Sequence, residues 1–160
     1  MTKFQTLAIT PYLWFNDQAE DAARFYCSVF PNSKITEVTY DASGSVSQGS
    51  KPLVVTFRLA GQDFIALNGG PQFAFTEAIS FHISCDTQAE VDELWSKLSA
   101  GGEESNCGWL KDRYGLSWQV IPRALGEAIG DKDPKKAKKA IDAMLKMRKI
   151  DIATLEEARR

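Results

Sequence analysis

Short segments of the chain either alternate apolar and polar residues or are rich in β-forming residues, as expected of strands that bury one face. Those of the first half lie at 7–15, 34–40, 53–60 and 62–68, and those of the second half at 79–85, 103–105, 109–112 and 116–121. After the first segment of each half, apolar residues recur at helical spacing: Ala22, Tyr26, Val29 and Phe30, then Val91, Leu94, Trp95 and Leu98. The pattern predicts one βαβββ module in each half.

The two modules also repeat in sequence. The tripeptide Gln-Ala-Glu at 18–20 returns at 88–90, an offset of 70 residues. Asp17 and Thr87 precede these tripeptides and are residue types that cap helix N-termini, and the glutamate of each tripeptide is placed to complete a capping box. We therefore expect the two helices to begin at equivalent positions.

Turn-forming residues mark the boundaries. The sequence Asn-Gly-Gly-Pro at 68–71 predicts a turn or linker between the modules, and 41–51 predicts a polar loop inside the first one. We expect a single domain over 1–160, of the α+β class. It contains a first module at 4–68, a second module at 79–122 and a helical tail at 123–160.

The tail has its own helix signals. Asp133 and Pro134 supply an N-cap and a first-turn proline, and Asp151 predicts the cap of a last short helix that ends near residue 158. Between them lies an apolar stripe of Ala137, Ala140, Ile141, Met144 and Leu145. The lysines at 135, 136, 138 and 139 form a solvated face, or alternatively a contact for an acidic partner or a phosphate.

Charge and composition narrow the class of partner. The 19 basic and 21 acidic residues leave a formal net charge of −2, so a small-molecule ligand or a protein partner is favoured over nucleic acid. The sequence contains no signal-peptide core and no apolar run of the roughly 20 residues that cross a bilayer, so we expect a cytoplasmic protein without membrane contact. The three cysteines are odd in number and widely spaced, which predicts reduced thiols.

Alternation assigns the two faces of the leading strands. The apolar face toward the helix is predicted to hold Ile9, Pro11, Leu13, Phe15, Ile79, Phe81, Ile83 and Cys85. The opposite face is predicted to hold Thr10, Tyr12, Trp14, Ser80, His82 and Ser84. A face that mixes polar and aromatic residues suits a binding cleft.

Several residues are candidates for ligand contact. His82 is the only histidine, so a site that needs two imidazoles is excluded, and His82 contacts a ligand or is a hydrogen-bonded structural residue. Asn68 and Gln119 are neutral amides that could reach the cleft, although turn chemistry explains Asn68 equally well. Cys107 precedes Trp109 in a loop that enters a hairpin, and a nucleophilic role lacks a second histidine as base.

Several separated motifs resemble one protein family. The opening Ile-Thr-Pro-Tyr-Leu-Trp-Phe at 9–15, with Ala19-Glu20 and Phe25-Tyr26, resembles the vicinal oxygen chelate superfamily, which includes glyoxalase I, bleomycin resistance proteins and extradiol dioxygenases. The segments 66–71, 79–81, 107–112, 114–115, 117–119 and 147–151 resemble its PhnB-like branch, often labelled demethylubiquinone 3-methyltransferase-like. The resemblance implies a glyoxalase-like fold of two modules with curved mixed sheets forming a cleft, plus C-terminal helices, commonly as a homodimer.

The metal ligands that the resemblance implies are not matched here. Enzymes of the superfamily hold a divalent metal with His and Glu side chains from the first and last strand of each module. The matching positions are Thr10 or Pro11, Ser80, Gln119 and a residue within 66–68, none of which supplies an imidazole or a carboxylate. We therefore predict no cofactor and no tightly held metal.

Three functional hypotheses follow. In the first, the chain binds a small, partly aromatic ligand between Tyr12, Trp14, Trp118 or Trp109 and the polar groups of Ser80, His82, Asn68 and Gln119. In the second, it is an enzyme, either a divergent metal-dependent lyase, isomerase or dioxygenase, or a methyltransferase. The methyltransferase has little support, because the sequence shows no strand that is followed by a G-x-G loop and a helix. In the third, it is a dimeric scaffold with a vestigial cleft.

Overall fold

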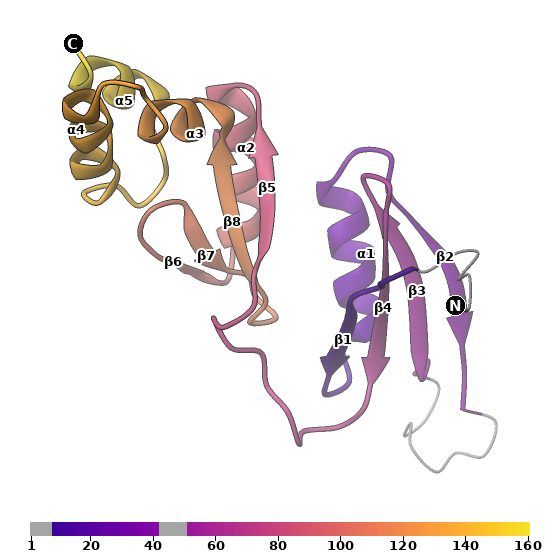
Figure 1. Cartoon of the computed structure of the whole chain (residues 1–160). Coiled ribbons are helices and arrows are strands. Elements are labelled where there is room, and N and C mark those ends of the chain that lie inside the picture. Colours follow the sequence, from indigo (N-terminus) through magenta and orange to yellow (C-terminus); the bar gives the residue numbers. More distant parts are fainter. Residues whose placement is uncertain (1–7, 42–50) are drawn as a thin grey trace, which may run out of the picture. The chain divides into compact units, whose positions relative to one another are not determined.

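The computed structural model describes residues 8–41 and 51–160, which form two four-stranded sheets and five helices (Figure 1). The first compact unit, Met1–Ala74, contains β1 (Tyr12–Phe15), α1 (Ala19–Val29), β2 (Lys34–Thr39), β3 (Val54–Leu59) and β4 (Gln62–Asn68). The second unit, Phe75–Arg160, contains β5 (Phe81–Cys85), α2 (Gln88–Ser99), β6 (Glu103–Glu104), β7 (Trp109–Lys111) and β8 (Ser117–Pro122). The tail adds α3 (Arg123–Ile129), α4 (Pro134–Met144) and α5 (Ile152–Ala158). The predicted α+β class is confirmed.

The two sheets share one topology. Their strand orders are β1-β4-β3-β2 and β5-β8-β7-β6, so each module places its first strand beside its last. These neighbours are parallel, whereas the other pairs in each sheet are antiparallel. The sequence repeat is therefore also a structural repeat.

In the first unit, α1 buries its apolar face against one side of the sheet. Tyr26 and Phe57 are fully buried, with ring centroids 6.2 Å apart, and Phe57 in turn stacks on Phe64 at 5.5 Å. Ala22 and Val29 complete the helix face as predicted. Burial of large apolar side chains of this kind contributes about 1.5–3 kcal/mol each.

In the second unit, α2 packs in the same way. The buried residues of the helix are Val91, Trp95 and Leu98. They share the core with buried Leu110 and Trp118 of the sheet. Trp95 also donates from Nε1 to Glu104 Oε1 at 2.8 Å, which ties the helix to the edge strand β6.

The two helices begin differently. At α2, Thr87 accepts from the backbone of Glu90 and the Glu90 carboxylate accepts in return, so the predicted capping box is confirmed. At α1 the N-cap residue is Gln18 and no side-chain cap is present, so the prediction for Asp17 is wrong. The backbone N–H of Ala19 donates instead to Asn68 Oδ1 of β4, at 2.8 Å. A strand residue thus satisfies the donor that a local cap would otherwise bind.

The leading strands are shorter than predicted. Leu13, Phe15 and Cys85 are buried toward the helices, as alternation requires. Ile9 and Ile79, however, are 94% and 71% exposed, because both precede the first residue of their strand. Most of the predicted polar loop, 42–50, and the start of the predicted first strand lie outside the described residues.

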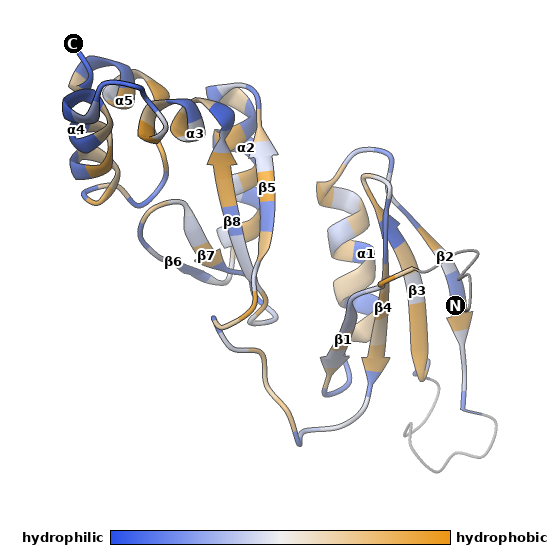
Figure 2. Ribbon diagram, in the orientation of Figure 1, coloured by the Kyte–Doolittle hydropathy of each residue, from blue (hydrophilic) through white to orange (hydrophobic). Residues whose placement is uncertain are grey.

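The tail packs through a small core of its own. Leu125, Ile150 and Leu155 are buried together, and Ile121 of β8 packs against them. The predicted caps are confirmed, since Asp133 accepts from the backbone of α4 and Asp151 from that of α5. Figure 2 shows much of α4 as hydrophilic, which fits its lysine-rich face. Within the part of the chain that the structure describes, no helix is long and apolar enough to cross a membrane.

Candidate functional site

A row of candidate residues crosses the second sheet on the side opposite α2. His82 of β5 pairs in register with Gln119 of β8, and Gln119 pairs with Trp109 of β7. Residues paired across neighbouring strands point to the same face of the sheet. Because Leu110, Trp118 and the other core residues alternate with them, this row lies on what we call the open face.

The amide of Gln119 has a defined partner on this face. Its Nε2 donates to Ser80 Oγ at 2.8 Å, which joins two candidates that are 39 residues apart in sequence. Gln119, Ser80 and Trp109 are half-buried, whereas His82 is exposed. The fold thus brings the indole ring of Trp109, the amide of Gln119, the hydroxyl of Ser80 and the imidazole of His82 together on one face.

Different residues lie at the two ends of the open face along β8. At one end Ile121 packs against the tail core. At the other end Ser117 pairs in register with Lys111, and Lys111 with Glu103 of β6. Side chains two positions apart on a strand share a face, so these residues continue the open face beyond Gln119 and Trp109.

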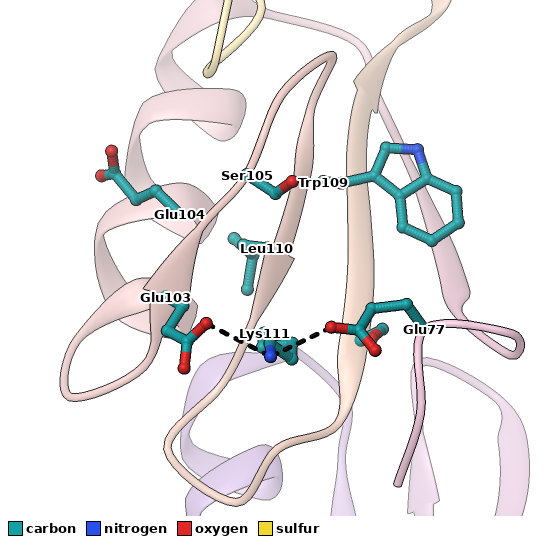
Figure 3. Close-up of a pocket in the computed structure, with 8 residues that line it drawn as sticks. Glu77, Glu103, Glu104, Ser105, Trp109, Leu110 and Lys111 are labelled. Carbon is teal, nitrogen blue, oxygen red and sulfur yellow. Dashed lines mark ion pairs between the residues drawn. The ribbon is translucent and has the colours of Figure 1, made fainter.

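A cavity of about 150 Å³ lies at the Lys111 end of the open face (Figure 3). Lys111 Nζ lies 3.0 Å from Glu77 Oε1 and 3.2 Å from Glu103 Oε2. The hydrogen bonds and charges of these carboxylates raise the pKa of Lys111, and the hydrogen bond from Lys111 lowers the pKa of Glu77. Both shifts favour the charged forms of Lys111 and Glu77.

The first sheet carries an equivalent but less polar row. Tyr12 pairs with Ile65 and Ile65 with Thr56, and Tyr12 lies 70 residues before His82. Ile65, rather than a residue within 66–68, is therefore the counterpart of Gln119. Thr10 is half-buried and precedes β1.

Trp14 shares the face of Tyr12 but is held by the linker. Its Nε1 donates to Gly70 O at 2.8 Å, and its ring meets Phe73 edge-on at 5.0 Å. A Cβ added to Gly69 would lie 2.4 Å from the indole, so only glycine fits this approach. Trp14 fixes the start of the linker.

Asn68 and Trp118 do not lie on an open face. Asn68 is buried on the helix side, where Oδ1 accepts from Ala19 and Nδ2 donates to Pro52 O at 2.8 Å. Trp118 is buried in the core of the second unit, and its Nε1 donates to Asp112 Oδ2 at 2.8 Å. The strand period turns both side chains toward the helices, so neither lies on the face that carries His82, Gln119 and Trp109.

Cys107 connects the second sheet to the tail. Its backbone N–H donates to Met147 O at 2.8 Å, and its thiol donates to Met144 O at 3.6 Å. The residue has a φ of 58°, a left-handed conformation that few non-glycine residues adopt. The thiol of Cys107 thus faces the tail backbone.

The equivalent positions of the two modules do not fit a tightly held divalent metal. The residues in register, Tyr12, Ile65, His82 and Gln119, offer one phenol, one alkyl group, one imidazole and one amide, without a carboxylate. The first-strand positions expected from the sequence, Thr10 or Pro11 and Ser80, also lack a carboxylate and an imidazole. Hard cations prefer charged oxygen ligands, and borderline metals prefer several imidazoles or thiolates. Within residues 8–41 and 51–160, no three His, Cys, Asp or Glu side chains gather closely enough to hold a metal ion.

Sequence reasoning missed the charged cluster of Lys111. Glu103 and Lys111 face each other across the β6–β7 hairpin, a pairing that a correct hairpin register would have suggested. Glu77 lies 34 residues before Lys111 in the segment that precedes β5, and no local pattern predicts their contact.

Comparison with known proteins relates the chain to one family. The model of the 3-demethylubiquinone-9 3-methyltransferase family matches residues 7–121. The PhnB protein of Bacillus cereus is 34% identical with a TM-score of 0.66, and the match covers 72% of this chain and 99% of that one. No curated protein matches.

Two further solved structures share the fold alone. Protein PA1353 of Pseudomonas aeruginosa is 20% identical with a TM-score of 0.59, covering 71% of this chain and 95% of that one. The fosfomycin resistance protein FosX of Listeria monocytogenes, in complex with Mn(II) and a dihydroxypropylphosphonic acid, is 18% identical with a TM-score of 0.52, covering 72% and 90%.

Proposed function

Because the chain belongs to the PhnB-like 3-demethylubiquinone-9 3-methyltransferase family of the vicinal oxygen chelate superfamily, we propose that it binds a small aromatic ligand on the open face of its second sheet. The observation that carries this proposal is the register row of His82, Gln119 and Trp109. The first sheet offers Tyr12, Ile65 and Thr56 at the same positions, which provide fewer groups able to orient a ligand.

The row has the composition of a small-molecule site. An indole ring provides apolar area and stacking for a planar ligand, worth about 0.5–1.5 kcal/mol beyond the area buried. The amide of Gln119, oriented by Ser80, and the imidazole of His82 provide hydrogen bonds that fix the ligand's orientation.

The proposal is tested by titrating the chain with phenol and following the tryptophan side-chain signals by NMR. Trp109→Ala and Gln119→Leu are expected to weaken phenol binding at least fivefold, since each removes one contact from the row. Lys97→Ala on α2 is the matched control, because Lys97 pairs with Glu93 on the opposite side of the unit. Unchanged affinity in both row variants would refute the proposal.

We also propose that binding requires no tightly held metal. The donor set of the four equivalent positions supports this part of the proposal. Protein purified without chelator is expected to carry less than stoichiometric metal. Its melting temperature is expected to stay constant with manganese, nickel, zinc or iron(II). Stoichiometric metal together with a shift specific to one cation would contradict it and favour a metal-dependent lyase or dioxygenase.

A methyltransferase is the second candidate, because the matched family carries that description. Stabilisation by S-adenosylmethionine in a thermal-shift experiment would favour this candidate over simple binding. We further propose that the protein is cytoplasmic, in keeping with its three free cysteines. We also propose that it forms a homodimer. Light scattering of the purified chain tests the dimer, and a mass of one chain would contradict it.

A further inference from the structure

The cavity at the Lys111 end of the open face is lined by an excess of negative charge. Its lining residues are Glu77, Glu103, Glu104, Ser105, Trp109, Leu110, Lys111 and Ser117. Three carboxylates and one ammonium give this lining a formal charge of −2. Glu104 Oε1 accepts a hydrogen bond from Trp95 Nε1, and Glu104 Oε2 lies 3.9 Å from the Arg148 guanidinium. The charge of Glu104 is therefore partly compensated by Arg148, which does not line the cavity.

Lys111 is shared between the two remaining carboxylates. Figure 3 shows its ammonium between Glu103 and Glu77, with an ion pair to each. One ammonium cannot neutralise two carboxylates, so Glu77, Glu103 and Lys111 together keep a formal charge of −1. This negative charge would attract a cationic ligand. An anionic ligand would instead have to displace a carboxylate from Lys111.

Ser117 provides an independent sign that a ligand group belongs in this cavity. The residue is 1% exposed, and it lines the cavity from β8. Its Oγ is a buried polar atom without a hydrogen-bond partner within the described residues. Buried hydroxyls are nearly always paired, so a donor or acceptor from a bound molecule would satisfy this one.

Trp109 and the size of the cavity limit the ligand further. The indole lines the same cavity as the carboxylates, and aromatic rings attract ammonium and guanidinium groups. The volume of about 150 Å³ is that of a cavity able to hold a benzene-sized molecule. The lining thus combines net negative charge, an aromatic surface and one unsatisfied hydroxyl.

We propose that this cavity makes the open face selective for an organic cation, with an ammonium or guanidinium group held by Glu77 and Glu103 beside the ring of Trp109. The inference rests on the proposed function, since Trp109 belongs to both. It adds the charge of the ligand, which the row of His82, Gln119 and Trp109 does not specify. The ligand group replaces bulk solvent at the carboxylates while Lys111 stays paired.

The test uses three probes of one shape and different charge: benzylamine, benzyl alcohol and benzoate. They are titrated into the intact chain at low ionic strength, with the tryptophan side-chain signals followed by NMR and Trp109→Phe used to assign the Trp109 signal. Benzylamine is expected to bind at least tenfold more tightly than benzyl alcohol, and benzoate more weakly than either. Added salt should shrink this preference, because the carboxylates are partly exposed.

Variants locate the source of the preference. Glu103→Gln and Glu77→Gln are each expected to reduce the affinity for benzylamine at least fivefold. The affinity for benzyl alcohol is expected to stay unchanged. Glu93→Gln is the matched control, since Glu93 pairs with Lys97 on α2 and does not line the cavity. Equal binding of amine and alcohol, or tighter binding of benzoate, would overturn the cation preference and leave the proposed function standing. Failure of all three probes to bind would overturn both.

Discussion

Asn68→Ala provides the sharpest test of how the structure divides structural residues from binding residues. The Asn68 side chain is 5% exposed and makes two hydrogen bonds of 2.8 Å, from Ala19 N–H and to Pro52 O. Alanine leaves both buried backbone groups without their partner, at a cost of about 1–3 kcal/mol each. We expect the free energy of unfolding to fall by about 3 kcal/mol, because α1 also loses the acceptor at its first turn.

Urea denaturation followed by circular dichroism measures this loss. With urea slopes of about 1–3 kcal/mol per M, a loss of about 3 kcal/mol lowers the midpoint by about 1–3 M. Asn16→Ala is the matched control, since Asn16 is an exposed asparagine close to the same turn, and its midpoint is expected to stay within error of wild type. A stable Asn68→Ala protein that no longer binds phenol would refute the structural assignment and return Asn68 to the site.

Other substitutions probe the caps and turns of the second unit. Thr87→Ala removes the capping box of α2 and should cost about 1 kcal/mol in urea unfolding. Gly108→Ala adds a Cβ 2.5 Å from Ile121 Cδ1 at a φ of 83°. Limited proteolysis should therefore cleave the tail faster, and an unchanged cleavage rate would contradict this. Asp112→Asn replaces the carboxylate that accepts from Trp118 Nε1 by an amide, which offers that donor either a weaker acceptor or an N–H₂ group. The free energy of unfolding should fall by about 1–3 kcal/mol, and the near-ultraviolet circular dichroism of the tryptophans should change.

Local patterns predicted most of the elements. The βαβββ order of both modules, the buried faces of the two helices and the caps at Thr87, Asp133 and Asp151 all follow from short-range spacing. These features depend on residues a few positions apart, where periodicity and capping chemistry act.

Long-range contacts account for what the sequence could not predict. Asp17 was expected to cap α1, yet the acceptor for the Ala19 N–H is Asn68 of β4, which lies 49 residues after Ala19. The same contact removes Asn68 from the candidate site. The contact between Glu77 and Lys111 likewise requires the fold before it can be recognised.

The candidate site was predictable in its residue types and not in its arrangement. Alternation placed Ser80 and His82 on one face, and the isolated amide of Gln119 suggested a partner. Only the parallel register of β5 and β8 puts His82 beside Gln119, and no turn of fixed length sets that register. Trp118 alternates with Gln119 along β8, so its indole turns toward α2, where Nε1 donates to the Asp112 carboxylate.

The most direct test of the account is a map of the backbone amides that shift when benzylamine is added to the isotope-labelled chain. We predict that the shifts concentrate at His82, Gln119, Trp109 and Lys111, and that the amides of Val91 and Leu98 in α2 stay unchanged. Shifts concentrated on α2 or confined to the first unit would contradict the claim that the open face of the second sheet is the binding site.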